Sequence, residues 1–463
     1  MTSQTKQHAS LDELRSSIDG RIVMPGDDDY DAMRQVFVGD VDGRPTAIIR
    51  VANAGDVARV VDFVRSTGVE LAIRSGGHSN AGHSTTNGGI VLDLRDMTAI
   101  DIDPAARTAW AEAGLTALDL TKATAEHGLA VGFGDTGSVG ISGITLGGGI
   151  GYTVRKHGLT IDSLLAAEIV TADGQLRHLD AEHEPDLFWA IRGGGGNFGV
   201  ATRFQYGLHD VREVVGGLLV LPATPETIVG FMAAAEAAPD EVSTIANVMP
   251  APPMPFLPAE HHGKLVILGF VLHVGDIEAG QRAVAPFRSL ATPIVDMLRP
   301  MSYPDIYPPE DPGYRPTPVQ RTMFLDRVDQ SAAETIIEFL EASDASLRAT
   351  QLRFLGGAVA QIPVDATAFA HRRSRILTVL VNFHDGTPGD RERRQAWVDD
   401  FAAALRQGDD GAYVNFLGDG GEAGVRAAYP GATWDRLVAI KERYEPSNLF
   451  HLNQNIPPAG RSR

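Results

Sequence analysis

The chain has 463 residues, which is long for one domain and indicates two or three packed units. Its formal net charge of −19, from 59 acidic and 40 basic side chains, disfavours nucleic acid and anionic membrane surfaces as partners. The absence of cysteine excludes disulfides, iron–sulfur clusters, thiolate metal sites and cysteine nucleophiles. Neither a signal-peptide core nor an apolar run of membrane-spanning length is found, so we expect a cytoplasmic protein.

Residues 20–135 alternate short β-branched runs with segments of helical periodicity. The patterns predict strands within residues 45–52, 69–75 and 90–97, and helices at residues 56–67 and 115–128. This alternation is typical of an α/β or α+β nucleotide-binding unit.

Residues 136–210 hold two glycine clusters, separated by two strand-like runs that meet at the turn ADG. From residue 211 to about 410 glycine becomes sparse, and proline-rich loops separate strands such as 264–274 from helices such as 331–343. This shift in composition predicts a second domain with a mixed sheet flanked by helices. The chain then ends in an amphipathic helix, a proline and an asparagine-rich tail.

The first motif that carries chemistry is RSGGHS, at the exit of a predicted strand. Glycines there allow successive backbone N–H groups to turn toward one anion, which suits a pyrophosphate. A lone histidine in such a turn is more often structural than functional. The same alternative applies to His83, in a second Gly-His-Ser sequence. The candidate ligand-binding residues of this motif are Arg74, Ser75, Gly76, Gly77, His78 and Ser79.

The second motif is VGISGITLGGGIGY, in which closely spaced glycines allow backbone to approach a flat ring or a phosphate. It lacks both the GxGxxG spacing of a dinucleotide fold and the lysine of a P-loop, which disfavours an NAD-binding dehydrogenase. A glycine-rich turn without a ligand is the alternative. The candidate residues are Gly140, Ser142, Gly143, Thr145, Gly147, Gly148, Gly149 and Tyr152.

The third motif is the run GGGGNFGV at residues 193–200. Four consecutive glycines are costly in chain entropy unless the backbone must pass close to something. Together the three clusters predict a long ligand of dinucleotide size. The candidate residues here are Gly196, Asn197, Gly199 and Val200.

Other constellations are weak. The pair His261 and His262 has no third ligand at metal spacing, and His183 belongs to no HExxH pattern, so no metal site is predicted. No G-x-S-x-G elbow occurs, which leaves a serine hydrolase unsupported.

The motifs RSGGHS, GGIVLDLRDM, VGISGITLGGGIGY, DLFWAIRGGGGNFGV and YEPSNLFHLNQNIPP resemble the berberine-bridge-enzyme-like branch of the vanillyl-alcohol-oxidase family of FAD-linked oxidases. The resemblance implies an α+β fold, with a PCMH-type FAD-binding domain of two α+β subdomains and a substrate domain whose antiparallel sheet covers the flavin. We expect the FAD-binding domain at residues 1–210, the substrate domain at 211–410, and a C-terminal segment at 411–463 that returns to the FAD domain.

The resemblance also implies how FAD is held. In the family the histidine of RSGGH bonds to the flavin 8α-methyl group, and His78 occupies that place. Many relatives add a link through cysteine in the segment that here reads DTGS, residues 135–138. Since the chain has no cysteine, a single covalent link is predicted. The amides of Asn453 and Asn455 are expected near the flavin, because they can hydrogen-bond the edge of the ring.

The implied activity is oxidation of a small alcohol, sugar or amine by hydride transfer to flavin N5, with oxygen as the acceptor. Candidate acid–base residues are Tyr413, in a predicted strand at residues 412–416, and Tyr152, although both could be packed core tyrosines. Relatives often have tyrosine where this chain has Phe416. A flavin dehydrogenase with another acceptor is an alternative, since Ile141 could hinder oxygen, and a non-catalytic flavin carrier is a second. The sequence leaves the oligomeric state open.

Overall fold

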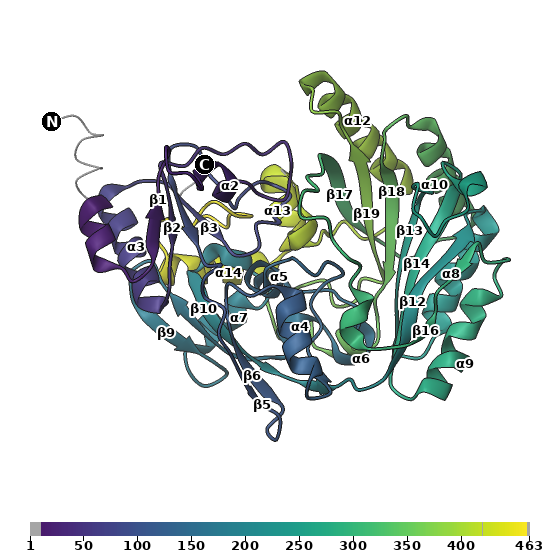
Figure 1. The fold of residues 1–463 in the computed structure, drawn as a ribbon, viewed down its shortest axis with the longest axis horizontal. Coiled ribbons are helices and arrows are strands. Elements are labelled where there is room, and N and C mark those ends of the chain that lie inside the picture. The colour runs from purple at the N-terminus through teal and green to yellow at the C-terminus, as the bar shows by residue number, and fades with distance from the viewer. Residues whose placement is uncertain (1–10, 419, 461–463) are drawn as a thin grey trace.

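The computed structural model describes residues 11–418 and 420–460. Its first sheet contains the strands predicted between residues 45 and 97 (Figure 1). The sheet order is β1 (Arg21–Val23), β2 (Ala47–Arg50), β4 (Ile90–Asp93) and β3 (Leu71–Arg74). Strands β2 and β3 run parallel to β4, and β1 is antiparallel to β2. Because β3 lies at the sheet edge, the motif that follows it leaves the sheet at its border.

Helix α3 (Ala54–Thr67) confirms the helix predicted between β2 and β3. The Asn53 side chain accepts a hydrogen bond from the Asp56 N–H at its start, and Gly68, with φ of 69°, ends it. A short helix, α2 (Tyr30–Met33), precedes β2.

The second sheet is antiparallel, in the order β5 (Ile100–Asp103), β6 (Thr108–Glu112), β10 (Val200–Gly207), β8 (Leu164–Val170) and β9 (Leu176–Leu179). The turn predicted at ADG joins β8 to β9 as expected. Strand β7 (Leu129–Ala130) pairs separately with β11 (His209–Asp210). The helical and 3₁₀ segments among these strands are α4 (Ala117–Ala125), α5 (Ile141–Gly147), α6 (Val154–His157), η1 (Thr160–Asp162), α7 (Pro185–Ile191) and η2 (Gly195–Asn197).

Helix α5 occupies half of the second motif, for which a glycine-rich turn was the alternative interpretation. Its first two glycines, Gly140 and Gly143, have ordinary backbone angles and tolerate a helix between them. Only Gly148 and Gly149, with φ of 132° and 80°, adopt a conformation that favours glycine, and the helix ends there.

The third sheet is the largest, with β15 (Val295–Asp296), β12 (Val214–Pro222), β14 (Leu265–Val274), β13 (Val242–Pro250), β18 (Arg348–Phe354), β19 (Ile376–Phe383) and β17 (Pro318–Leu325) in spatial order, and β16 (Arg299–Met301) beside β12. All its pairs are antiparallel, as the family resemblance implied; the mixed sheet inferred from composition is wrong. Runs of alternating strands and helices do not distinguish parallel crossovers from antiparallel returns.

Helices cover the outer face of this third sheet (Figure 1). They are α8 (Pro225–Ala237), α9 (Ile277–Arg288), α10 (Gln330–Ala342) and α12 (Pro388–Leu405). The short segments η3 (Ala259–His261), η4 (Tyr303–Ile306) and α11 (Ala358–Gln361) lie in its connections. No helix within the described residues is long and apolar enough to cross a bilayer.

The C-terminal segment consists of η5 (Val414–Phe416), α13 (Gly421–Ala428) and α14 (Ala432–Tyr444), and it lies against the N-terminal half (Figure 1). The strand expected at residues 412–416 is a 3₁₀ turn, closed by hydrogen bonds from the Phe416 N–H to the Tyr413 carbonyl and from the Leu417 N–H to the Val414 carbonyl. Alternating apolar and polar residues fit such a turn as well as a strand, so the sequence pattern was misleading here.

Candidate active site

A cavity of about 360 Å³ lies where the three glycine clusters, η5 and the C-terminal tail meet. Most of the predicted site residues line it: Ser75, Gly76, Gly77, His78, Ser79, Gly140, Ser142, Gly143, Gly196, Asn197, Gly199, Val200, Tyr413 and Asn453. The others do not: Arg74, Thr145, Gly147, Gly148, Gly149 and Tyr152 lie behind its wall, and Asn455 lines a neighbouring hollow. The fold therefore brings segments from both ends of the chain to one site.

The turn after β3 forms one wall and leaves backbone donors unused. The buried Arg74 guanidinium donates to the Ser84 and Met33 carbonyls and thus holds the turn from behind. A Cβ on Gly76 would lie 2.2 Å from the Gly140 nitrogen, so the first two glycine clusters touch. Within the described residues, the N–H groups of residues 76–79 have no hydrogen-bond acceptor. Such a nest of free N–H groups suits an anion.

The His78 ring lies in this wall as a neutral imidazole. It stacks on Phe37, with ring centroids 4.2 Å apart and planes at 21°. Its Nε2 is 3.0 Å from the Ser138 Oγ. Burial lowers the pKa of His78 to about 4; nearby Glu310 raises it and Arg315 lowers it, both to a smaller extent. At neutral pH the ring is therefore uncharged and has one nitrogen lone pair available.

Two glycines keep the cavity open. A Cβ built on Gly143 in α5 or on Gly196 in η2 would meet no protein atom within 4 Å, and both residues face the cavity. Gly147 and Gly149 differ, because their Cβ atoms would lie 1.9 Å from the Asn415 Oδ1 and the Thr160 Oγ1 respectively. The first pair makes room for a ligand, and the second pair makes room for protein packing.

The two candidate tyrosines occupy different environments. Tyr413 lines the cavity, and its Oη accepts hydrogen bonds from the Gly149 N–H and the Asn415 Nδ2, both at 2.9 Å. Burial raises the pKa of Tyr413 to about 12, so the phenol keeps its proton at neutral pH. Tyr152 instead lies in an aromatic core with Phe270 and Tyr307, at centroid distances of 6.3 Å, away from the cavity. The core alternative describes Tyr152.

The C-terminal tail is fastened to the third glycine cluster through Asn197. The Asn197 Nδ2 donates to the Gln454 carbonyl at 3.1 Å, and its Oδ1 accepts the Ile456 N–H at 2.9 Å. The Oδ1 atoms of Asn453 and Asn455 are buried and have no partner within the described residues. An unpaired buried amide oxygen is costly, which indicates that a ligand or water completes the cavity wall at Asn453 and the neighbouring hollow at Asn455.

Sequence reasoning missed Phe37, Glu310 and the ion pair between Asp135 and Arg353. The Asp135 Oδ2 lies 2.6 Å from the buried Arg353 Nη2, and Asp135 lines the cavity. Phe37 stacks on His78, and Glu310 contacts Ser138 beside it, both from distant parts of the chain that no local pattern marks. Asp135 lies in the segment noted for its missing cysteine, which was the only available signal.

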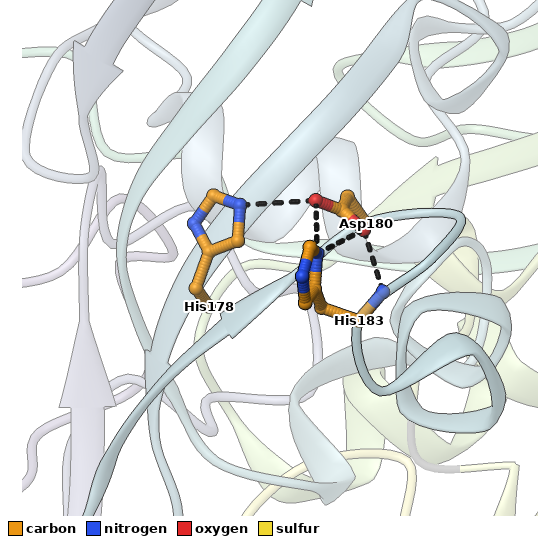
Figure 2. A group of neighbouring side chains, drawn as sticks. All are labelled: His178, Asp180 and His183. Carbon is orange, nitrogen blue, oxygen red and sulfur yellow. Dashed lines mark hydrogen bonds and ion pairs between the residues drawn. The ribbon is translucent and has the colours of Figure 1, made fainter.

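His178, Asp180 and His183 form a surface cluster at the end of β9, outside the cavity (Figure 2). Their potential ligand atoms lie within 4.8 Å of one another. However, His178 Nε2 and His183 Nδ1 already contact the Asp180 carboxylate at 3.0–3.1 Å, and Asp180 also accepts backbone N–H groups of its own turn. These hydrogen bonds account for the cluster without an ion, and the absence of a metal stays a prediction.

The residues present fit FAD. Free N–H groups suit its pyrophosphate, the open positions at Gly143 and Gly196 give it space, and unpaired amide oxygens lie at the tail. A neutral histidine faces the same cavity.

Comparisons with known proteins agree with this fit. Residues 45–180 match the family model described as FAD binding domain, and residues 412–457 match berberine and berberine like. The chain is 29% identical to (R)-6-hydroxynicotine oxidase of Paenarthrobacter nicotinovorans, covering 96% of this chain and 98% of that protein. It is 26% identical to xylooligosaccharide oxidase of Thermothelomyces thermophilus, covering 90% and 88%. The crystal structure of 6-hydroxy-D-nicotine oxidase from Arthrobacter nicotinovorans superposes with a TM-score of 0.83 at 28% identity, covering 95% and 98%.

Proposed function

We propose that this chain, which belongs to the berberine-bridge-enzyme-like branch of the FAD-linked oxidases, binds its FAD covalently through His78 and oxidises a small alcohol, sugar or amine. One observation carries the proposal: a neutral imidazole with a free ring nitrogen faces a cavity built from all three glycine clusters. A single link is proposed because the chain has no cysteine for a second.

The wall residues divide the work of holding the cofactor. The N–H groups of residues 76–79 would hold the pyrophosphate, and the tail amides, including Asn453, would hydrogen-bond polar edges. Gly143 and Gly196 would allow close approach of the backbone. When bound, the flavin accepts the hydride equivalent removed from the substrate.

Tyr413 is proposed as the residue that orients the substrate. Its oxygen already accepts two hydrogen bonds, from Gly149 and Asn415, so its own proton is free to be donated to a substrate oxygen or nitrogen. With a pKa of about 12 it acts as a donor rather than as a base at neutral pH. The carboxylate of Asp135, which Arg353 holds in place on the cavity wall, is the better-placed proton acceptor.

Oxygen is proposed as the electron acceptor. A bulky Ile141 side chain in the cavity could block the access of oxygen to the flavin ring. Ile141 is fully buried in the core and does not line the cavity, whereas its neighbours Gly140 and Ser142 do. This placement favours an oxidase over a dehydrogenase.

The proposed division into domains at residues 210 and 410 draws support from the two main hydrophobic cores. One core combines buried residues between 11 and 208 with residues from 412 to 456, and the other contains residues from 215 to 405. A single buried residue from the middle region, Ala368, joins the first core.

The test has two parts. Acid-precipitated protein should stay yellow, and His78→Ala should release its FAD; His83→Ala, at the neighbouring Gly-His-Ser, is the matched control and should keep it. Flavin that washes out of the wild type would overturn the covalent link. In the second part, bleaching of the flavin by an alcohol, sugar or amine without air, followed by rapid recovery in air, is expected. No bleaching by any of them would indicate a flavin carrier, and slow recovery would indicate a dehydrogenase.

A further inference from the structure

Ser138 and Glu310 form a hydrogen-bonded chain that ends on His78. The Glu310 carboxylate accepts the Ser138 N–H at 3.0 Å and also contacts the Ser138 hydroxyl. An ionised carboxylate can only accept, so the hydroxyl proton points at Glu310. The Ser138 Oγ must then accept from the His78 Nε2, 3.0 Å away. This arrangement puts the imidazole proton on Nε2.

The other ring nitrogen is consequently left unprotonated. Within the described residues, the His78 Nδ1 makes no hydrogen bond, and the ring lines the cavity. Stacking on Phe37 fixes the plane of the ring. Of the charged groups around it, Glu310 favours and Arg315 disfavours protonation, and burial keeps the ring neutral.

We propose that Ser138 and Glu310 are positioning residues that select the His78 tautomer, so that Nδ1 is the atom that bonds to the flavin. The inference rests on the covalent link proposed above. It adds a role for two residues, one of which, Glu310, comes from the loop before β17 (Pro318–Leu325).

In the proposed attachment, a bond would form between the His78 Nδ1 and the 8α carbon of the flavin, and one 8α C–H bond would break. The carbon would lose a proton, and the electron pair of that bond would remain on the ring system, which would thereby be reduced by two electrons and take up two protons. The alkylated imidazole would carry a positive charge, so Nε2 releases its proton toward Ser138 and Glu310. Dioxygen would then reoxidise the flavin and be reduced to hydrogen peroxide.

The experiment follows covalent attachment in apoprotein made in a riboflavin-starved host. After FAD is added, samples are denatured in acid and the flavin fluorescence of the protein band is measured over time. Ser138→Ala should slow attachment by roughly 100-fold, the range of a lost proton-transfer partner, while noncovalent FAD binding is kept. Glu310→Gln should also slow it, because the amide can donate to Ser138 and reverse the chain. Ser138→Thr should restore the rate, and Asp311→Asn, with the same charge change on the same loop, should not alter it.

The tautomer itself is measured by ¹⁵N NMR of histidine-labelled apoprotein, with the His78 signals assigned by their absence in His78→Ala. The proposal is supported if the Nε2-protonated tautomer predominates in the wild type and no longer predominates in Ser138→Ala. A proton on Nδ1 in the wild type would overturn it, as would wild-type attachment rates in both Ser138→Ala and Glu310→Gln. If the wild type attaches no acid-stable flavin at all, the covalent link has failed instead, and the two failures are thus distinguished.

Discussion

The wall of the cavity and the layer behind it use the same residue types for different reasons. On the wall, Gly143 and Gly196 have nothing within 4 Å of a would-be Cβ, whereas behind it Gly147 and Gly149 would collide with Asn415 and Thr160. The two regions differ in what fills the space beside the glycine. Because Gly143 and Gly196 also line the cavity, their empty neighbourhoods leave room for a ligand, whereas the filled neighbourhoods of Gly147 and Gly149 serve packing.

The two candidate tyrosines show the same difference between the cavity wall and the layer behind it. Tyr413 reaches the cavity with its hydroxyl fixed by two donors, and Tyr152 packs among aromatic rings. If the comparison is right, changes on the wall alter flavin binding or turnover first, and changes behind the wall lower stability first.

The largest effect is expected from Gly143→Leu. Gly143 lines the cavity, and a Cβ there meets no protein atom within 4 Å, so a leucine side chain should occupy space that FAD needs. Purified protein should therefore contain no FAD, and FAD affinity should fall by more than about 100-fold, equivalent to about 2.7 kcal/mol. The apoprotein should be as stable as the wild type or up to about 1 kcal/mol more stable, because glycine is a poor helix residue. FAD content and thermal unfolding of the apoprotein measure the two expectations.

Two variants make that result specific. Gly389→Leu, at an open helical position in α12, should leave FAD binding unchanged. Gly149→Ala, behind the wall, combines a φ of 80° with a Cβ 1.9 Å from Thr160 and should destabilise the apoprotein by about 1–2 kcal/mol or more. Normal FAD content in Gly143→Leu would contradict the assignment of the wall.

An effect of similar size, on stability and not on flavin binding, is expected from Lys441→Met in α14. Lys441 is fully buried, pairs with Glu445, and donates to the Asn197 and Phe450 carbonyls. Removing one partner of a buried ion pair costs about 3–5 kcal/mol, since the other charge is left unpaired. Urea unfolding of the apoprotein should show this loss. Lys441→Met combined with Glu445→Leu should recover part of it, and a larger loss in the double variant would contradict the explanation.

Local patterns predicted much of the fold, and contacts between distant segments account for what they missed. Helix α3 and strand β14 follow from periodicity within their own residues. The turn at Val414–Phe416 did not, because its apolar alternation also fits a strand. Glu310 lies 172 residues from Ser138, so no spacing rule could connect them. The glycine clusters predicted the place of the cavity, but only packing shows which glycines face it.

A smaller effect is expected from Tyr413→Phe. The variant should keep its FAD but lose about 1–3 kcal/mol of stability, because the Gly149 N–H and the Asn415 amide lose their acceptor. It should also lose roughly 10²-fold in kcat, because a hydrogen bond to the reacting substrate disappears. Steady-state turnover with the substrate found in the bleaching screen measures it. Tyr152→Phe is the matched change behind the wall and should leave kcat unaltered. Equal losses in both variants would remove the distinction between the two tyrosines.

The smallest effect is expected at the surface cluster of His178, Asp180 and His183, which belongs to neither region (Figure 2). Hydrogen bonding to Asp180 raises the pKa of His183 above 6.5, and the same contact lowers the pKa of Asp180 below 3.8. A raised histidine pKa stabilises the folded state below the unfolded value and loses that stabilisation as the pH rises through the folded value. A lowered aspartate pKa stabilises the folded state above the unfolded pKa, and this stabilisation is lost as the pH falls through the folded pKa. The pair therefore contributes fully to folded-state stability between about pH 4 and 6.5.

His183→Ala should lower Tm slightly in this window, with the difference shrinking at higher pH, while FAD content and attachment stay at wild-type values. A change in flavin content would show that the cluster is coupled to the cavity, which its position outside the wall argues against.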